Sequence, residues 1–169
     1  AYVNFQRALL GFWERGILLA INSKNNETDV KEVFAKNKYM ILKEEHFAAI
    51  RTNWFDKSEN VKSIARELNI GLDSMIFIDD SQFERTRMQK EASKVLIPEW
   101  PQEPEQYLRS LFALNVFHQM SLEEEDRKKN KMYTDEKKRK KILENSSDLE
   151  DYLKTLNIKI KILEGKAVN

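Results

Sequence analysis

Two kinds of hydrophobic pattern alternate along the first part of the chain. Continuous apolar runs at residues 17–21 and 75–78 are typical of strands that are buried on both faces of a parallel sheet. Between these runs, and ahead of them in residues 5–12, apolar side chains recur at helical spacing. This alternation predicts an α/β fold with a parallel sheet.

The expected elements follow from these patterns and from the residues that bound them. Gly16 ends the opening helix, and Asp56 with Glu59 has the spacing of a capping box at the start of a later helix. The other predicted helices are 27–36, 57 to about 71, 83 to about 92 and 107–114, and the predicted strands are 17–21, 40–42, 75–78 and 95–97. Strands that alternate with helices in this way indicate a three-layer, Rossmann-like domain with right-handed crossovers.

The pattern changes after this domain. Residues 123–144 are dominated by charged side chains, which predicts a long solvated helix or arm that begins at a capping box, Ser121 to Glu124. A short helix is expected at 148–156, and residues 157–162 alternate strictly, as a half-exposed strand does. We therefore expect three parts: an α/β domain at 1–118, a charged helical extension at 119–156, and the start of a further domain at 157–169. The opening residue is Ala1, with no capping residue ahead of the first helix, so we also expect a longer parent protein.

Composition narrows the chemistry. The chain has no cysteine, which excludes disulfides and thiolate metal sites, and two histidines, His46 and His118, leave little material for a zinc site or a catalytic triad. Lysine and arginine number 29 against 28 acidic residues, so the overall charge does not favour nucleic acid. The basic cluster 137–141 is interpreted as a solvated face. We expect a cytoplasmic protein with neither nucleic-acid nor membrane partners.

Four residues form a pattern suited to phosphoryl chemistry. Ser23 and the pair Asp79 and Asp80 follow the buried strands directly, and ligand sites of open α/β sheets lie beyond the carboxyl ends of the strands. Lys57 opens a helix, where an anion would compensate its charge. Carboxylates suit Mg²⁺, while a hydroxyl and a lysine suit phosphate oxygens. One aspartate could instead cap the helix that begins near Gln82.

Several neighbours are weaker candidates. Glu84 could hydrogen-bond a metal-bound water, but an ion pair on an exposed helix face is slightly preferred. Trp54 could line a cleft with Asn53, although core packing is favoured for both Trp54 and Phe47. The possible substrate-binding or supporting residues are Asn22, Lys24, Asn25, Asn53 and Glu84.

A family resemblance covers most of the chain, from Ala1 to about residue 162. Its motifs are residues 18–26, 43–49, 53–57, 68–74 and 77–80. With these motifs the chain resembles the FkbH-like family of the haloacid dehalogenase superfamily. The resemblance implies that Ser23 is the second motif of that superfamily, Lys57 the third, and Asp79 with Asp80 the fourth, which holds Mg²⁺. The family usually shows Asp-Asp-Asn-Pro at the fourth motif, whereas Ser81 and Gln82 follow here.

The first motif of the superfamily, Asp-x-Asp-x-Thr, is expected ahead of the opening helix and is absent from this sequence. Its leading aspartate is the nucleophile, so the resemblance implies a magnesium-dependent phosphatase or phosphotransferase whose nucleophile lies upstream. The implied substrate is a phosphorylated small molecule. Family members are linked to polysaccharide or polyketide biosynthesis and to glyceryl transfer to an acyl carrier protein. The alternative is a noncatalytic interaction module with the same fold.

Overall fold

The computed structural model describes residues 1–117, 132–133, 135–136 and 139. Contacts divide the chain into two units, Ala1–Thr134 and Asp135–Asn169. The elements of the first unit are α1 (Tyr2–Glu14), β1 (Leu19–Ser23), α2 (Glu27–Lys36), β2 (Phe47–Thr52), α3 (Lys57–Leu68), α4 (Gln82–Glu91) and α5 (Tyr107–Phe112), joined in part by 3-10 turns. The sequence thus predicted α1, α2, α3, α4 and α5 within a few residues.

The sheet consists of short parallel pairings. β1 pairs with β2 in parallel, with Ala20 opposite Ala49 and Ser23 opposite Thr52. The predicted strands at 75–78 and 95–97 also meet in parallel, but only through the isolated bridge between Ile76 and Leu96. The α/β class with a parallel sheet is confirmed, whereas the extent of the last two strands was overestimated.

The strand predicted at residues 40–42 is wrong, and β2 lies at Phe47–Thr52 instead. The side-chain oxygen of Gln6 in α1 accepts hydrogen bonds from the backbone N–H groups of Ile41 (2.9 Å) and Leu42 (3.2 Å), so a helix side chain satisfies these donors. In β2, Ala49 is 1% exposed and packs in a cluster with Ile64 and Leu68 of α3. Its small side chain favours the close approach of α3, a tertiary contact that β-propensity does not report.

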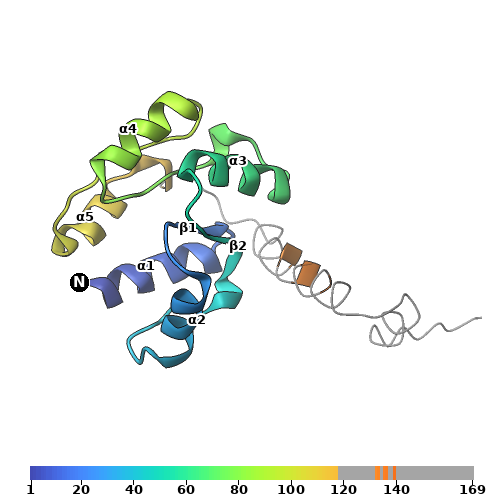
Figure 1. Ribbon diagram of the computed structural model, residues 1–169. Coiled ribbons are helices and arrows are strands. Elements are labelled where there is room, and N and C mark those ends of the chain that lie inside the picture. The colour runs from blue at the N-terminus through green and yellow to red at the C-terminus, as the bar shows by residue number, and fades with distance from the viewer. Residues whose placement is uncertain (118–131, 134, 137–138, 140–169) are drawn as a thin grey trace, which may run out of the picture. The chain divides into compact units, whose positions relative to one another are not determined.

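Helices cover both sides of the strands (Figure 1). Phe77 packs in a cluster with Val61 of α3 and Met88 of α4, whereas Ile78 packs in a second cluster with Phe12 of α1 and Leu111 of α5. Consecutive side chains of an extended segment point to opposite faces, which explains why these neighbours join different clusters. The 75–78 segment therefore lies between the α3–α4 layer and the α1–α5 layer.

The helix ends differ in part from the expected ones. Gly16 has a φ of 91° just after α1, as a helix-terminating glycine does. α3 ends earlier than predicted, because Asn69 adopts the left-handed conformation with φ 52°. The capping box at Asp56 does not form: the Asp56 carboxylate pairs with Arg87 of α4, and Glu59 pairs with Lys62.

The predictions for the end of the chain concern residues that lie almost entirely outside the described part. These are the helix start at Ser121, the helix at 148–156 and the strand at 157–162. Within the described part of the predicted arm, the hydroxyl of Tyr133 donates a hydrogen bond of 2.9 Å to the carbonyl oxygen of Leu68, at the end of α3. None of the helices among the described residues is both long enough and apolar enough to cross a membrane.

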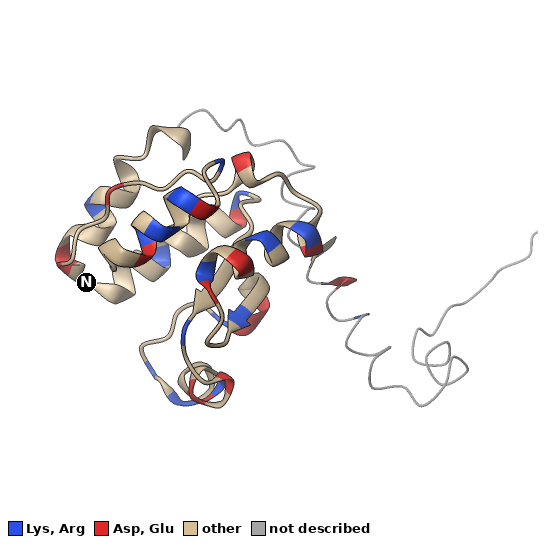
Figure 2. Cartoon of the chain, turned by 45° about the horizontal axis from the view of Figure 1, so that its top comes forward, with Lys and Arg blue, Asp and Glu red and all other residues tan. Residues whose placement is uncertain are grey.

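Charged side chains are interspersed along the helices. Figure 2 shows basic and acidic positions next to one another on the same elements. Ion pairs one helical turn apart occur in α2, between Glu27 and Lys31, and in α4, between Arg87 and Glu91. The Glu27 carboxyl has a lowered pKa because Lys31 donates a hydrogen bond to it. Such pairs belong to solvated helix surfaces.

Candidate functional site

An ion pair joins the start of α3 to the end of the 75–78 segment. Lys57 Nζ lies 2.5 Å from Asp79 Oδ2, and the two side chains are 15% and 6% exposed. A cation in the first turn of a helix opposes the helix dipole, so Lys57 needs a neighbouring anion. The structure supplies that anion from within the chain, as the Asp79 carboxylate. Two residues that are 22 positions apart in the sequence thus form the centre of the site.

The loop after Asp79 is held by hydrogen bonds to its backbone. Asp79 Oδ1 accepts a hydrogen bond of 2.9 Å from the Ser81 N–H group. The buried guanidinium of Arg85 donates to the carbonyl oxygens of Asp79 (2.7 Å) and Asp80 (3.0 Å). Asp80 itself is exposed. The loop therefore presents one buried and one solvent-facing carboxylate side by side.

The cap of α4 is Ser81, whose hydroxyl accepts a hydrogen bond from the Glu84 N–H group at 3.4 Å. The alternative in which an aspartate caps this helix is therefore wrong. With the cap supplied by Ser81, neither aspartate is taken up by capping α4. Arg85 was missed by the sequence reasoning, because an arginine in a highly polar helix that also carries Arg87 gives no sign of burial.

An amide network fixes the geometry around the start of α3. Asn22 of β1 donates a hydrogen bond of 2.8 Å to the carbonyl oxygen of Lys57. Asn60, which is 4% exposed, donates to the side-chain oxygens of Asn22 (3.1 Å) and Asn53 (2.9 Å), and Asn53 donates back to Asn60 at 3.2 Å. These residues act as positioning residues because they lock β1, the loop after β2 and α3 together.

Asn60 was not among the predicted residues. It lies next to Val61 and one turn before Ile64, within the apolar stripe of α3. A polar side chain at such a position must find partners when it is buried. The presence of a polar residue within the apolar stripe of α3 could therefore have predicted that Asn60 is buried and hydrogen-bonded.

Ser23 is the last residue of β1 and is half-buried. Its carbonyl oxygen accepts a hydrogen bond of 3.1 Å from the Asn53 N–H group. The preceding residue, Asn22, contacts Lys57, so Ser23 stands at the same end of the strands as the Lys57–Asp79 pair. Asn25 lies away from this centre: it is exposed, and its side chain accepts a hydrogen bond from the Asn26 N–H group.

A second ion pair closes the site on the side of α4. Lys24 Nζ lies 2.7 Å from Glu84 Oε1, and the Glu84 side chain is only 11% exposed. The preferred interpretation of Glu84, an ion pair on an exposed face, is wrong, because the carboxylate is buried and pairs with the loop after β1. Lys24 and Glu84 are thus part of the structure of the site.

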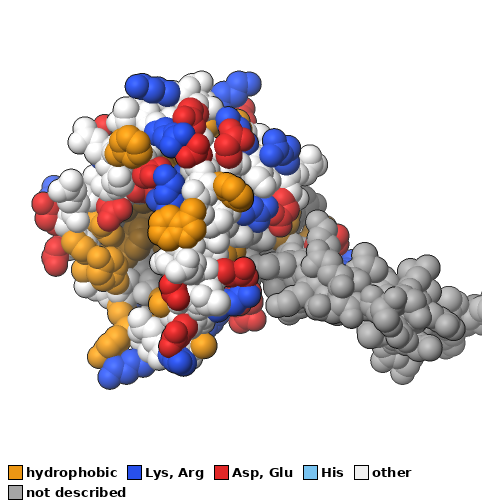
Figure 3. Space-filling view, viewed as in Figure 1, with side chains coloured by type: hydrophobic (Ala, Val, Ile, Leu, Met, Phe, Trp, Pro, Cys, Tyr) orange, Lys and Arg blue, Asp and Glu red, His pale blue; other side chains and the backbone are white. Residues whose placement is uncertain are grey.

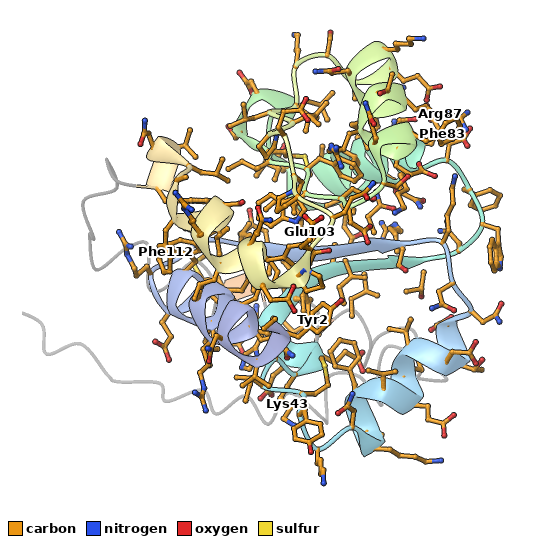
Figure 4. All side chains as sticks on the ribbon, turned by 90° about the vertical axis from the view of Figure 1, so that its left-hand side faces the viewer. Tyr2, Lys43, Phe83, Arg87, Glu103 and Phe112 are labelled. Carbon is orange, nitrogen blue, oxygen red and sulfur yellow. The ribbon has the colours of Figure 1, made fainter. Side chains whose placement is uncertain are left out.

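Three aromatic rings on the loop before α3 and on α4 are exposed. Trp54, Phe55 and Phe83 are 70%, 72% and 68% exposed. Asp56 and Arg87 form an ion pair of 2.5 Å that joins the loop before α3 to α4, which carries Phe83 (Figure 4). The core interpretation is confirmed for Phe47, which is buried, but it is wrong for Trp54. The three rings are therefore exposed on the loop before α3 and on α4, the elements that this ion pair joins.

The carboxylates also influence the first residue of α5. The pKa of Tyr107 is raised, chiefly by burial and then by the negative charges of Asp80 and nearby groups. The ring of Tyr107 contacts that of Tyr2, at the start of α1, with centroids 6.1 Å apart. Figure 4 shows Tyr2 and Glu103 on the same side of the molecule. Tyr107 therefore lies near enough to the loop with Asp79 and Asp80 for the two carboxylates to influence its pKa.

The donor set fits a divalent cation of the Mg²⁺ type. Among the described residues, no group of three acidic or histidine side chains gathers, so a Mg²⁺ ion at this site would rely on the adjacent carboxylates of Asp79 and Asp80. Mg²⁺ is commonly bound through one or two carboxylates and keeps several waters or substrate oxygens as its other ligands. The exposed carboxylate of Asp80 is open to such an ion.

Comparisons with known proteins point to one solved structure. Neither the protein-family profiles nor the curated proteins contain a match to the chain. Among solved structures, the N-terminal part of the protein BF1531 from Bacteroides fragilis, containing a phosphatase domain complexed with Mg, is 42% identical over 68% of this chain, with a TM-score of 0.66. The match covers 31% of that protein's chain, so the present chain spans about a third of its length. The chain is therefore similar in sequence and fold to part of a structure that contains a phosphatase domain.

Proposed function

We propose that this chain is the larger part of a magnesium-dependent phosphatase or phosphotransferase domain of the haloacid dehalogenase type, with FkbH-like character. The observation that carries the proposal is the contact between Lys57 and Asp79 at the carboxyl end of the strands, beside the exposed carboxylate of Asp80. The likeness to BF1531, whose solved part contains a phosphatase domain complexed with Mg, supports the same reaction class.

Each residue has a role that suits its position. Asp79 and Asp80 would hold Mg²⁺, which supplies charge neutralisation to a bound phosphoryl group. Lys57 stabilises negative charge on a phosphate oxygen, and Ser23 donates a hydrogen bond to another. Asn22, Asn53 and Asn60 hold the start of α3, and with it Lys57, in place. The nucleophilic aspartate belongs to a segment outside the present sequence.

The substrate side of the proposal is a phosphorylated small molecule. The exposed rings of Trp54, Phe55 and Phe83 offer an apolar rim to the rest of the substrate or to a carrier. By the family resemblance, the pathway is polysaccharide or polyketide biosynthesis in the cytoplasm, and the carrier is an acyl carrier protein. The division into a domain at 1–118, an extension at 119–156 and a following domain at 157–169 belongs to the same proposal.

Metal binding is the first test, and it does not need catalysis. We expect Mg²⁺ to shift the backbone amide resonances of Asp79, Asp80 and Ser81 in the full 169-residue chain, with saturation. Asp80→Asn should weaken this binding at least about tenfold, because it removes a charged ligand. Asp29→Asn, an exposed aspartate in α2, is the matched control. Binding that is unchanged in both Asp79→Asn and Asp80→Asn would overturn the metal assignment.

Turnover is the second test, in the natural full-length protein. We expect magnesium-dependent hydrolysis of p-nitrophenyl phosphate that Lys57→Met and Asp79→Asn each reduce at least about a hundredfold. Magnesium binding without turnover on any phosphate ester would favour the noncatalytic interaction module instead.

A further inference from the structure

α4 carries two arginines that lie in different surroundings. The side chain of Arg87 is 35% exposed, and it pairs with the acids Asp56 and Glu91. Figure 3 shows basic and acidic side chains next to one another on the face that carries α4. The side chain of Arg85, in contrast, is only 10% exposed. Arg85 has therefore lost most of its contact with water, and other groups of the protein must compensate its charge.

Backbone carbonyl groups provide most of this compensation. Arg85 Nη1 donates hydrogen bonds to the carbonyl oxygens of Asp79 (2.7 Å) and Asp80 (3.0 Å). In the described part of the chain, the acid that pairs with Arg85 is Glu99, whose side chain is 98% exposed and whose Oε2 atom lies 3.7 Å from Arg85 Nη2. Hydrogen bonds from a charged donor are stronger than those between neutral groups. The main contacts of Arg85 are thus with the backbone of the loop that carries the two aspartates.

These two hydrogen bonds define the course of the chain after residues 75–78. In an extended strand, the carbonyl groups of successive residues point in opposite directions. Those of Asp79 and Asp80 instead converge on one nitrogen atom, so the chain turns between them. The two side chains differ accordingly, because Asp79 is buried against Lys57 and Asp80 is exposed. The contact with Arg85 therefore lies where the two neighbouring carboxylates take up different surroundings.

The position of Arg85 in α4 explains how it reaches this loop. Arg85 is the fourth residue of α4, and helix side chains lean toward the N-terminus of their helix. The loop is held from the same helix end by Ser81, whose N–H group donates to Asp79 Oδ1 at 2.9 Å and whose hydroxyl caps α4. The start of α4 thus contacts the backbone of both aspartates and one of their carboxylates.

We propose that Arg85 is a positioning residue of the magnesium site, which holds the backbone of Asp79 and Asp80 so that both carboxylates can bind one ion. The inference rests on the proposed function and deepens it, because it names a residue outside the carboxylate pair on which the metal affinity depends. Arg85 touches neither metal nor substrate in this role. Removal of groups that orient metal ligands commonly weakens metal binding about ten- to a hundredfold.

The charge of Arg85 alone predicts the opposite effect. Its guanidinium lies next to the loop, and two cations repel each other, so loss of this charge should strengthen Mg²⁺ binding if Arg85 acted only through its electrostatic field. Loss of the two hydrogen bonds should instead weaken binding, because the carbonyl groups of Asp79 and Asp80 would no longer converge on one donor. The sign of the change therefore separates the two explanations.

The test measures Mg²⁺ binding to the 169-residue chain through the shifts of the backbone amide resonances of Asp80 and Ser81. We expect Arg85→Met to raise the dissociation constant at least about tenfold. Arg85→Lys keeps the charge and hydrogen-bond donors, so it should bind Mg²⁺ more tightly than Arg85→Met does. The matched control is Arg87→Met on the same helix, which should change the dissociation constant less than about twofold because salt screens its more exposed charge.

A second control separates positioning from general damage to α4. Met88→Ala removes a buried side chain one turn beyond Arg85, so it should destabilise the chain without weakening Mg²⁺ binding to the folded molecules. If Arg85→Met fails to fold, Arg85→Gln takes its place with the same expected weakening, because its shorter neutral side chain cannot hold both carbonyl groups as the guanidinium does.

The possible outcomes distinguish this inference from the function on which it rests. Unchanged or tighter binding in Arg85→Met would overturn the inference and leave the metal assignment standing. Weakening as large in Met88→Ala as in Arg85→Met would also overturn it, because affinity would then follow the stability of α4. Absence of Mg²⁺ binding in the unchanged chain would overturn the inference together with the metal assignment.

Discussion

At the scale of single residues, the site depends on an ion pair, Lys57 with Asp79, whose side chains are both largely buried. Asp79 is 9% exposed and meets Lys57 on one oxygen and the Ser81 N–H group on the other. Burial of an ion pair carries a desolvation cost that the attraction between the two charges offsets, and removal of either partner leaves an uncompensated buried charge. The motif residues could be named from the sequence, whereas their mutual contact could not, because it joins different elements.

The Lys57–Asp79 pair should show strong energetic coupling. We expect Asp79→Asn and Lys57→Met each to lower the free energy of unfolding by about 2 kcal/mol, since each leaves a partner charge with little solvent. The double variant should lose clearly less than the sum, with a coupling of about 1 kcal/mol. Urea unfolding of the four proteins measures this cycle. The exposed pair Glu27 and Lys31 is the control, and coupling no larger than in that pair would contradict the prediction.

Tyr107 gives a prediction about pH. Its pKa is raised, chiefly by burial and then by Asp80, so the folded chain keeps the phenolic proton to a higher pH than the unfolded chain does. Above a pH of about 10 the unfolded state therefore binds fewer protons, and stability falls as the pH rises. Tyr107→Phe should flatten this decline in urea unfolding, with Tyr39→Phe as the matched control. A decline of unchanged slope in Tyr107→Phe would refute the assignment.

At the scale of elements, α3 organises the site. Its first residue is Lys57, its buried Asn60 ties it to β1 and the loop after β2, and its face packs on Ala49 of β2. The helix itself was predictable from its apolar stripe. Its partners were not, because the stripe does not reveal which strand it covers.

The amide network should contribute measurably to stability. We expect Asn60→Ala to lower the free energy of unfolding by about 2 kcal/mol, because Asn22 and Asn53 lose a buried partner. Asn4→Ala, an exposed asparagine in α1, is the control and should change little. Thermal and urea unfolding provide the measurement. A loss in Asn60→Ala as small as in the control would show that water replaces the network.

The end of α3 gives a second prediction at this scale. Asn69 has a φ of 52°, where a side chain with a Cβ atom is strained and asparagine is among the best tolerated. We expect Asn69→Ala to destabilise the chain by about 1 kcal/mol and Asn69→Gly to be neutral or slightly stabilising. Equal effects of the two substitutions in urea unfolding would contradict the left-handed cap.

At the scale of the whole described unit, the core is divided. One cluster joins α3 and α4 around Met88, another joins α1 and α5 around Leu111, and a third joins β2 to α3. An apolar cavity of about 650 Å³ is lined by residues of all three clusters, among them Val61, Phe12 and Ile64. A core divided into separate clusters is expected here, because the β1–β2 pairing and the Ile76–Leu96 bridge do not form one continuous sheet.

The division predicts additive core mutations. Met88 and Leu111 are 1% and 0% exposed, so Met88→Ala and Leu111→Ala should each cost about 2–5 kcal/mol. Because the two residues lie in different clusters, the double variant should cost the sum within about 0.5 kcal/mol. The experiment needs a stabilising osmolyte, since the combined loss approaches the stability of a typical domain. A clear departure from the sum would indicate one continuous core.

The sequence by itself determined the class of the fold and the helices α1 to α5 of the described part, because local periodicity is a property of the chain alone; it also predicted Ser23, Lys57, Asp79 and Asp80 as site residues from their positions at the ends of strands and the start of a helix. Tertiary structure decided the rest. β2 forms at 47–52 because Ala49 fits under α3, while the 40–42 segment binds Gln6. Asn60 and Glu84 became part of the site because their partners are far away in the chain. Strand pairing is non-local as well, so the neighbour of each strand cannot be specified by local sequence.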